Sequence, residues 1–457
     1  MKKFSNVALA FMVMGTSVMA QAKYVFYFIG DGLGSSQRQV AEYYKQDVLG
    51  KEGKLLMNTF PVAGINTTHA KDTLITDSAA AGTALATGYK TNNGLISQLP
   101  DGTKLKTLTN IAQEKNMKTG IVSTTRLTHA TPAVFAAANE SRANENEIAA
   151  DFTKSGVDYF AGGGFRNFTK KGGELTSSRK DDRDLVAEFQ SKGYSTFIGE
   201  NSIETFKNKK FKGDEKVFAA FTASHLPYEI DRKEAMPSLA ELTGKGIEIL
   251  GKNRDGFFMM VEGGRIDHAS HAQDALGTVK DVLAMDDAVK VAYDFYQKNP
   301  KDTLIVIAGD HETGGMGLGF GNSYFMSLDQ LKDTKVSVED TLQKAYTGNR
   351  AEFFQYISKN LGLSDLTGAE KKKIENAMDV QDKNDKGEME AYGGYKPVAI
   401  AAAHILSERA GVHWTSFAHT GTQIPLSAIG KGAENFTGFK DNTEIAKGVA
   451  QAMGGKL

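Results

Sequence analysis

The stretch Tyr24-Val25-Phe26-Tyr27-Phe28-Ile29-Gly30-Asp31-Gly32 decides the fold class of this chain. Its first six residues are β-branched or aromatic and show no polar alternation, which is typical of a strand buried on both faces. Similar apolar runs recur at 120–122, 257–261 and 304–308, and helical patterning separates them at 105–112, 238–250 and 275–296. This alternation predicts an α/β fold with a doubly wound, mostly parallel central sheet and helices on both faces.

The residues that follow the four apolar runs are rich in acids and glycine. They are Gly30-Asp31-Gly32, Ser123-Thr124, Glu262-Gly263-Gly264 and Gly309-Asp310-His311. In parallel α/β sheets, ligands bind beyond the carboxyl ends of the strands. Because three of these four ends carry a carboxylate beside glycine, we expect the functional site at this edge of the sheet.

The composition of the 457 residues excludes several classes of protein. With 40% hydrophobic residues and a net charge of -1, the chain is not of the disordered type. It has no cysteine, which rules out a disulfide framework, cysteine ligation of zinc or iron–sulfur clusters, and a cysteine nucleophile. The balanced charge gives no general attraction to nucleic acid or to an anionic membrane, so we expect neither as a partner.

The first 22 residues have the pattern of a secretory signal peptide. Lys2 and Lys3 precede an apolar run at 7–14, and small residues suited to cleavage follow, with Ala20 or Ala22 at the cleavage site. The apolar run is too short to span about 30 Å of hydrocarbon as a helix. We therefore expect a periplasmic or secreted protein whose catalytic domain occupies 23–457.

The hydrophobic pattern changes between Gly315 and His419. Helical patterning appears at 336–346, 351–361, 367–378 and 396–406, and Thr367 with Glu370 forms a capping box at the start of the third segment. We expect an inserted helical and irregular crown at about 316–411, above the carboxyl edge of the sheet. A separate domain is the less favoured alternative, since the chain returns to a site-like segment at His419.

The segment from Glu262 to His271 is the strongest chemical signal. Asp267 and His271 are four residues apart, so both lie on one face of a helical turn and can hold one metal ion. Asp310 and His311 bring an oxygen and an imidazole to the same sheet edge, and His419 would complete a mixed zinc site. A salt-bridged surface turn and a structural histidine are the ordinary alternatives.

Ser78 precedes a run of small, helix-forming residues. A serine at a helix N-terminus faces free backbone N–H groups, which suits an anion or an attacking oxygen. An N-cap serine with no chemical role is the commoner interpretation of such a residue. No Gly-x-Ser-x-Gly motif surrounds Ser78, so the sequence does not indicate the nucleophile of an α/β-hydrolase.

Taken together, these motifs resemble those of the alkaline phosphatases. The matching stretches run in the family's order: Gly30-Asp31-Gly32-Leu33-Gly34, Thr76-Asp77-Ser78-Ala79-Ala80, His129-Ala130-Thr131-Pro132-Ala133, Ser141-Arg142, 262–271, Asp310-His311-Glu312-Thr313-Gly314 and His419-Thr420-Gly421-Thr422. They extend from residue 24 to about 430 and leave mainly 315–411 poorly matched. As a set they are highly specific.

The resemblance implies two Zn²⁺ and one Mg²⁺ per subunit. It assigns one zinc ion to Asp267, His271 and His419, and the second to Asp31, Asp310, His311 and deprotonated Ser78. It assigns magnesium to Asp31, Thr131 and Glu262. Arg142 would hold two phosphate oxygens with its planar guanidinium.

His129 and His268 take the place of an aspartate and a lysine that some members of the family carry near magnesium. We expect both histidines to lie around the bound groups and to orient water or phosphate, although His268 could also approach the third metal ion.

The activity implied by the resemblance is hydrolysis of phosphate monoesters, with broad specificity, through a phosphoserine at Ser78. A phosphodiesterase, a sulfatase or a metal-dependent phosphoglycerate mutase of the same superfamily is the enzymatic alternative. A secreted phosphate- or metal-binding protein is the non-enzymatic one. The sequence leaves open whether the protein is a monomer or a homodimer.

Overall fold

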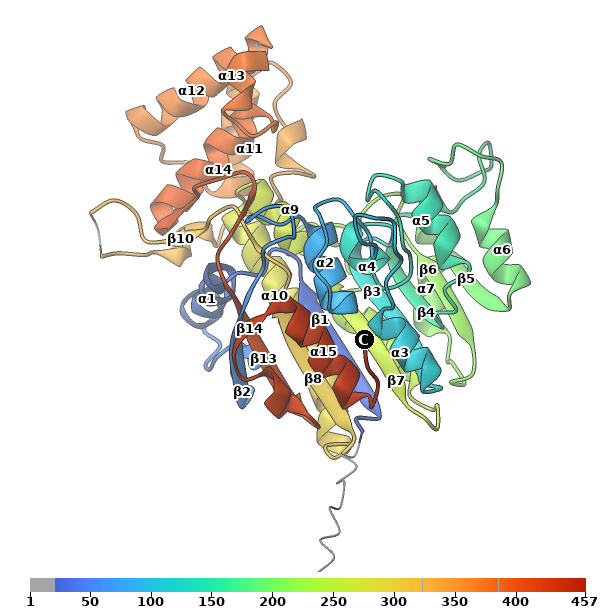
Figure 1. Cartoon of the computed structure of the whole chain (residues 1–457). Coiled ribbons are helices and arrows are strands. Elements are labelled where there is room, and N and C mark those ends of the chain that lie inside the picture. Colours follow the sequence, from blue (N-terminus) through green and yellow to red (C-terminus); the bar gives the residue numbers. More distant parts are fainter. Residues whose placement is uncertain (1–20, 323, 385) are drawn as a thin grey trace, which may run out of the picture.

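A ten-stranded sheet forms the centre of the molecule in the computed structural model, which describes residues 21–322, 324–384 and 386–457 (Figure 1). The strand order is β14-β2-β13-β8-β1-β7-β3-β4-β6-β5. Strand β13 runs antiparallel to both of its neighbours, and the other pairings in this sheet are parallel. The strands are β1 Tyr24–Gly30, β2 Val62–Thr67, β3 Lys118–Arg126, β4 Tyr159–Gly163, β5 Tyr194–Ile198, β6 Lys216–Ala220, β7 Phe257–Gly263, β8 Thr303–Gly309, β13 Ile424–Gly430 and β14 Gly438–Asp441.

Helices cover both faces of the sheet, which confirms the predicted fold class. Alternate side chains of β1 enter two different cores: Phe26 and Phe28 pack in one, and Val25, Tyr27 and Ile29 in the other. The first core includes residues of α1 Ser35–Tyr43, α7 Ile203–Asn208, α8 Leu239–Leu250 and α10 Ala275–Lys298. The second includes residues of α2 Ser78–Thr87, α3 Leu108–Glu114, α4 Ala130–Ala133, α5 Glu145–Phe152, α6 Leu185–Ser191 and α15 Asn442–Ala452.

The register of the three central strands brings the predicted acids together. Gly30 lies opposite Gly263 on one side and Gly309 on the other, and Ile29 lies opposite Glu262. Asp31 and Asp310 therefore leave the sheet at the same level, two residues beyond the level of Glu262. Helix α9, Arg265–His271, starts directly above this edge.

The crown, residues 316–411, stands above the carboxyl edge of the sheet (Figure 1). Its helices are α11 Arg350–Leu361, α12 Gly368–Lys383, α13 Lys386–Glu390 and α14 Pro397–Ala410. Buried side chains of α11, α12 and α14 join the core that also covers one face of the sheet. Thr367 and Glu370 form the predicted capping box. Two short ribbons complete the structure: β9 Glu312–Thr313 pairs with β12 His419–Thr420, and β10 Gly317–Leu318 with β11 Val412–His413.

The prediction of a helix at 336–346 is wrong. Only a single 3₁₀ turn, Leu342–Lys344, forms there. The N–H groups of Leu342 and Gln343 donate to the carbonyls of Ser337 and Val338, five residues back, at 2.9 and 3.0 Å. Carboxylates from other parts of the chain anchor the start of the segment: Asp231 accepts from the Ser337 N–H at 3.0 Å and Asp274 from the Val338 N–H at 2.9 Å. These contacts hold the segment in an irregular path over the sheet.

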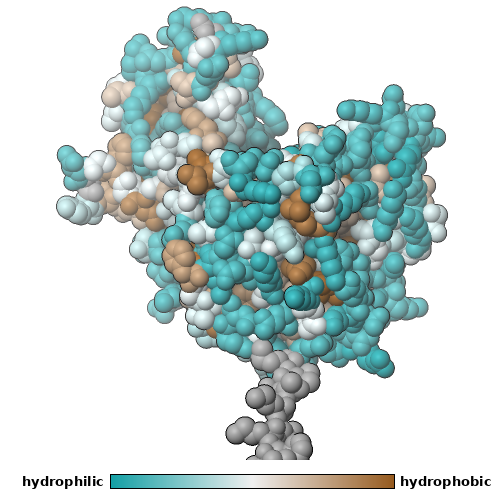
Figure 2. All heavy atoms as spheres, in the orientation of Figure 1, coloured by the Kyte–Doolittle hydropathy of each residue, from teal (hydrophilic) through white to brown (hydrophobic). Residues whose placement is uncertain are grey.

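The surface shown in Figure 2 is largely hydrophilic and is hollowed between the crown and the part that carries α5 and α6. Across the described ranges, no helix has both the length and the apolar character needed to cross a bilayer. Most of the expected signal peptide, residues 1–20, lies outside the described residues.

Candidate active site

Three groups of acidic and histidine side chains gather at the carboxyl edge of the sheet. They are Asp267, His271 and His419; Asp31, Asp310 and His311; and Asp31, His129 and Glu262. Within each group the potential ligand atoms all lie within 4.8 Å of one another. The structure thus brings together every carboxylate and histidine that the sequence proposed as a metal ligand.

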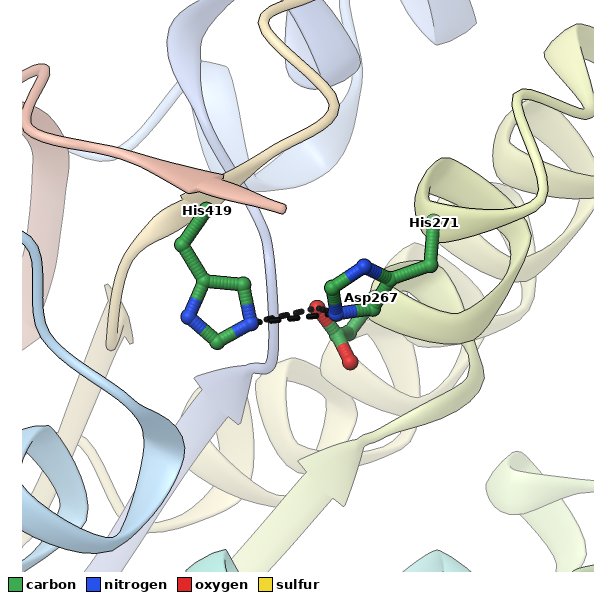
Figure 3. Close-up of side chains that lie close together, drawn as sticks. All are labelled: Asp267, His271 and His419. Carbon is green, nitrogen blue, oxygen red and sulfur yellow. Dashed lines mark hydrogen bonds and ion pairs between the residues drawn. The ribbon is translucent and has the colours of Figure 1, made fainter. Parts of the chain in front are cut away.

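The first group joins helix α9 to strand β12 (Figure 3). Nε2 of His271 and Nε2 of His419 are 3.1 Å apart, and Oδ1 of Asp267 lies 3.3 and 3.4 Å from them. Each Nδ1 donates to a backbone carbonyl, His271 to Phe417 at 2.6 Å and His419 to Thr76 at 2.8 Å. With these protons on Nδ1, two Nε2 lone pairs and a carboxylate face one point, which is the donor set of a cation site.

Glu312 holds the backbone around His419, and sequence reasoning gave it no role of its own. Its carboxylate accepts from Gln37 at 2.7 Å and from the N–H groups of Gly315 and Met316 at 3.1 and 3.0 Å, and also from the hydroxyl of Thr420. Glu312 is 4% exposed. It lies next to the predicted pair Asp310-His311, but a buried acid that binds backbone groups has no distinguishing sequence pattern.

The second group surrounds Ser78. Nε2 of His311 lies 3.3 Å from a carboxylate oxygen of Asp31 and 3.3 Å from one of Asp310. Thr313 stands between the two groups: its hydroxyl donates to Asp267 and lies 3.2 Å from Nδ1 of His311. The hydroxyl oxygen can therefore accept a hydrogen bond from Nδ1–H of His311, which leaves the Nε2 lone pair of His311 facing Asp31 and Asp310.

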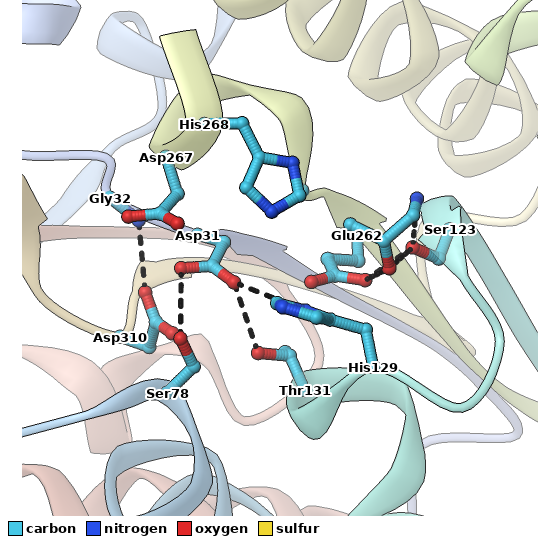
Figure 4. Close-up of polar contacts among 12 residues, drawn as sticks. Asp31, Gly32, Ser78, Ser123, His129, Thr131, Glu262, Asp267, His268 and Asp310 are labelled. Carbon is cyan, nitrogen blue, oxygen red and sulfur yellow. Dashed lines mark hydrogen bonds and ion pairs between the residues drawn. The ribbon is translucent and has the colours of Figure 1, made fainter. Parts of the chain in front are cut away.

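Ser78 is the first residue of helix α2 and is 1% exposed. Its Oγ lies 3.2 Å from Nε2 of His311 and 3.4 Å from Oδ1 of Asp31 (Figure 4). Asp77, not Ser78, is the N-cap, because its side chain accepts from the Ala80 N–H at 2.9 Å. The commoner interpretation of Ser78 as a helix cap is therefore wrong, and its hydroxyl points into the acidic cluster.

The third group lies on the other side of Asp31 (Figure 4). Oδ2 of Asp31 is 3.4 Å from the hydroxyl of Thr131 and 3.9 Å from Nδ1 of His129. Glu262 accepts from Ser123, which follows the second apolar run of the sequence, and from Thr125 at 3.3 Å. Its other oxygen, Oε1, is buried without a hydrogen-bond partner, as is Oδ2 of Asp310.

Arg142 lies at the rim of these groups and is held from two sides. One guanidinium nitrogen donates to Asp77 at 3.0 Å, and another lies 3.2 Å from Nε2 of His129. Since a guanidinium only donates, Nε2 of His129 accepts and the proton of the neutral ring sits on Nδ1, toward Asp31. This arrangement presents His129 to the third group as a donor.

Sequence comparison identifies the family. A family model described as alkaline phosphatase matches residues 22–454. Alkaline phosphatase 3 of Bacillus subtilis is 36% identical over 447 residues, which cover 95% of this chain and 89% of that protein.

The chain belongs to the alkaline phosphatase family.

Solved structures of alkaline phosphatases have the same fold. The enzyme of Thermus thermophilus superposes with a TM-score of 0.83 at 30% identity, covering 98% of this chain and 96% of that one. A cold-active enzyme from a psychrophilic Shewanella gives a TM-score of 0.80 at 28% identity, covering 94% and 99%. The protein is thus a phosphatase of a metal-dependent family, which excludes the non-enzymatic alternative, and its acid and histidine clusters could hold metal ions.

The buried carboxylates of this alkaline phosphatase resist ionisation in the absence of cations. Burial raises the pKa of Glu262 to about 8, and burial together with Asp267 raises the pKa of Asp310 to about 7. Burial and the charge of Asp310 raise the pKa of Asp31 well above its ordinary value. For Asp267, burial opposes ionisation, but His271 and His419 hold its pKa well below the usual range. A site with several buried carboxylates favours the binding of positively charged ions, because these ions compensate the cost of ionising the acids.

His225 is a site-facing residue that sequence reasoning missed, because no motif surrounds it. Its ring centroid lies 4.4 Å from that of His268 and 5.7 Å from that of His129. It also borders a cavity of about 860 Å³ that opens beside the phosphatase site. Charged residues of both signs line this cavity, among them Glu200, Glu204, Lys207, Asp231, Lys233, Asp340 and Lys344.

Proposed function

We propose that this alkaline phosphatase hydrolyses phosphate monoesters of broad specificity through a phosphoserine at Ser78. The position of Ser78 carries the proposal. Its buried Oγ stands at the N-terminus of α2, 3.2 Å from His311 and 3.4 Å from Asp31, with three cation-favouring groups around it.

We assign two Zn²⁺ and one Mg²⁺ per subunit. Asp267, His271 and His419 would hold one zinc ion, and Asp31, Asp310, His311 and Ser78 the other; Asp31, Thr131 and Glu262 would hold magnesium. The donor chemistry supports this division, because the first two sets mix imidazole and carboxylate and the third offers oxygens. The unpartnered oxygens of Asp310 and Glu262 fit bound cations.

Bound divalent cations neutralise the phosphate dianion and stabilise charge on the attacking and leaving oxygens. The chain's own residues supply the rest. Ser78 gives its proton to solvent water, and its Oγ attacks phosphorus as the P–O bond to the alcohol breaks. The alcohol leaves with a proton, and phosphoserine forms. Water then attacks phosphorus from the vacated side, the P–Oγ bond breaks, and inorganic phosphate is released while Ser78 regains a proton.

Arg142 favours monoesters over diesters. Its guanidinium can hold two non-bridging phosphate oxygens side by side, whereas a diester gives one of these positions to a substituent. Asp77 orients Arg142 from behind at 3.0 Å. The neighbouring cavity has room for an alcohol group, and its mixed charges impose no single preference, in agreement with broad specificity.

For the location of the protein, we propose export with a cleaved leader. Cleavage after Ala20 fits the fold better than cleavage after Ala22, because Ala22 is buried and donates its backbone N–H to Ala452 at 2.8 Å. Cleavage after Ala22 would remove this contact. N-terminal sequencing of the exported protein tests the choice.

The test of the mechanism is Ser78→Ala. Ser407→Ala is the control, because Ser407 is another buried serine, on α14, and its hydroxyl accepts from Trp414 at 3.1 Å. Ser78→Ala should lower hydrolysis of a chromogenic aryl phosphate by orders of magnitude and leave zinc content nearly unchanged. The matching diester and sulfate should be poor substrates of the wild type, and chelation should abolish turnover. Near-normal turnover of Ser78→Ala, with no phosphoserine trapped at low pH in the wild type, would contradict the mechanism.

A further inference from the structure

Arg265 is a buried cation next to the candidate active site, and neither the proposed metal sites nor the reaction uses it. Its side chain is 2% exposed. It is the first residue of α9, the helix that carries Asp267, His268 and His271. A buried guanidinium needs partners for its charge, so the groups around it indicate what it does.

Two segments outside α9 hold Arg265 in place. From the crown, Asp340 accepts from Nη2, and Glu339 lies 3.6 Å from Nη1. From the loop after β6, the ring of Tyr228 lies flat against the guanidinium, 3.5 Å from its central carbon, and the Tyr228 hydroxyl donates to Glu339. The guanidinium is therefore fixed in position and in direction.

The guanidinium of Arg265 also contacts His268. Nη1 of Arg265 lies 3.0 Å from Nδ1 of His268. A guanidinium has donors and no acceptor, so this contact is a hydrogen bond only if Nδ1 carries the lone pair. The proton of the neutral ring is then on Nε2. A doubly protonated ring would set Nδ1–H against the N–H of Arg265, so the contact also disfavours that form.

The Nε2 edge of His268 points toward the space between Asp31, His129 and Glu262 (Figure 4). A protonated Nε2 cannot coordinate a metal ion, but it can donate to an anion or to a water molecule.

We propose that Arg265 is a positioning residue that fixes the proton of His268 on Nε2, so that His268 presents a hydrogen-bond donor to the bound phosphoryl group and not a metal ligand. Glu339 and Asp340 make the crown part of this arrangement, because they hold the guanidinium that sets the ring. The proposal rests on the proposed function of the site, since it names the phosphoryl group as the acceptor.

The proton position can be measured without turnover. Long-range ¹H–¹⁵N spectra of the metal-loaded enzyme, labelled at its nine histidines, distinguish a protonated nitrogen from one with a lone pair, and His268→Ala identifies the signals of His268. We expect Nε2–H in the wild type and a mixture of the two neutral forms in Arg265→Met. A wild-type His268 protonated on Nδ1, or an unchanged ring in Arg265→Met, would overturn the proposal.

Kinetics test whether Arg265 acts through His268. Arg265→Met should raise both KM and the inhibition constant of inorganic phosphate by roughly tenfold, the value of one charge-assisted hydrogen bond, with a smaller change in kcat. In a His268→Ala background the same substitution should have little further effect. Additive effects, or a loss of kcat with unchanged phosphate inhibition, would show a merely structural role and refute the proposal.

Two variants in the crown test the proposal even if Arg265→Met does not fold. Asp340→Ala removes a partly exposed partner of Arg265, 42% exposed, and should weaken phosphate inhibition in the same direction. Asp329→Ala is the matched control, because Asp329 is 61% exposed and pairs only with Lys332 at 2.9 Å among the described residues. Equal inhibition constants for Asp340→Ala and Asp329→Ala would contradict a role of the crown in holding Arg265 against His268. If Ser78→Ala refuted the phosphoserine mechanism, the NMR result for His268 would still stand or fall by itself.

Discussion

Removal of the metal ions should make the stability of this enzyme depend strongly on pH, and Glu262 gives the size of the effect. The ordinary pKa of its carboxyl group is 4.5, and burial raises it to about 8 in the folded protein without cations. Below pH 4.5 the group is protonated in both the folded and the unfolded chain. As the pH rises toward 8, the unfolded chain loses this proton and the folded chain keeps it, so stability falls over this window.

The size of the loss in folding stability follows from the difference between the two pKa values of Glu262. Each pH unit in it corresponds to about 1.4 kcal/mol, so a rise from pH 5 to pH 9 costs the folded state roughly 4 kcal/mol at Glu262 alone. With an unfolding entropy of about 2 cal/mol/K per residue, this lowers Tm by roughly 5 °C for a chain of this size. Asp310 and Asp31, whose pKa values are also raised, act in the same direction.

Thermal denaturation of chelator-stripped and metal-restored enzyme at pH 5 and pH 9 measures the effect. The Tm difference between the two preparations should widen by roughly 5 °C or more at the higher pH, because bound cations compensate the carboxylates. Glu262→Gln is the matched control, because it keeps the shape of the side chain and removes its titration. The Tm of its metal-free form should lack the part of the pH dependence that Glu262 contributes. The same pH dependence of Tm in stripped and restored enzyme, or an unchanged dependence in Glu262→Gln, would refute this role of Glu262.

Three further substitutions test separate parts of the site. Arg142→Lys should raise KM and the phosphate inhibition constant by roughly 30-fold, about 2 kcal/mol, because an ammonium cannot hold two oxygens side by side; unchanged phosphate inhibition would remove Arg142 from the site. His271→Ala should release one zinc ion and leave the other, as metal analysis after dialysis would show, and loss of both or of neither would contradict the division of ligands. Glu312→Gln should weaken zinc binding by roughly tenfold, since Glu312 supports the strand that carries His419; titration with zinc of the stripped variant measures this, and wild-type affinity would rule the role out.

Local pattern was sufficient to predict the centre of this fold and most of its candidate site. Unbroken apolar runs marked β1, β3, β7 and β8, which are neighbours in the sheet. Since parallel strands in register end at one edge, the acids after them had to meet there, as Asp31, Glu262 and Asp310 do. The i,i+4 spacing of Asp267 and His271 was likewise enough to predict a shared metal-binding face.

Other features depended on partners far away in the sequence. His419 meets His271 across 148 positions, and Arg265 meets Asp340 across 75. The segment 336–346 has a helical pattern, yet the N–H groups of Leu342 and Gln343 donate to carbonyls five residues back, and only a 3₁₀ turn forms. His225 and Glu312 carry no motif, and only their contacts reveal them.

One physical cause separates the features that the sequence predicted from those that only the structure revealed. A strand, a helical turn or a cap is specified by interactions between residues close in sequence, so its pattern can be read directly. The proton position on His268, the support of His419 and the path of 336–346 depend on which donors and acceptors the completed fold brings within hydrogen-bond distance. The sequence by itself determined which residues reach the edge of the sheet, and the tertiary structure decided how each of them is held and which of its atoms faces the site.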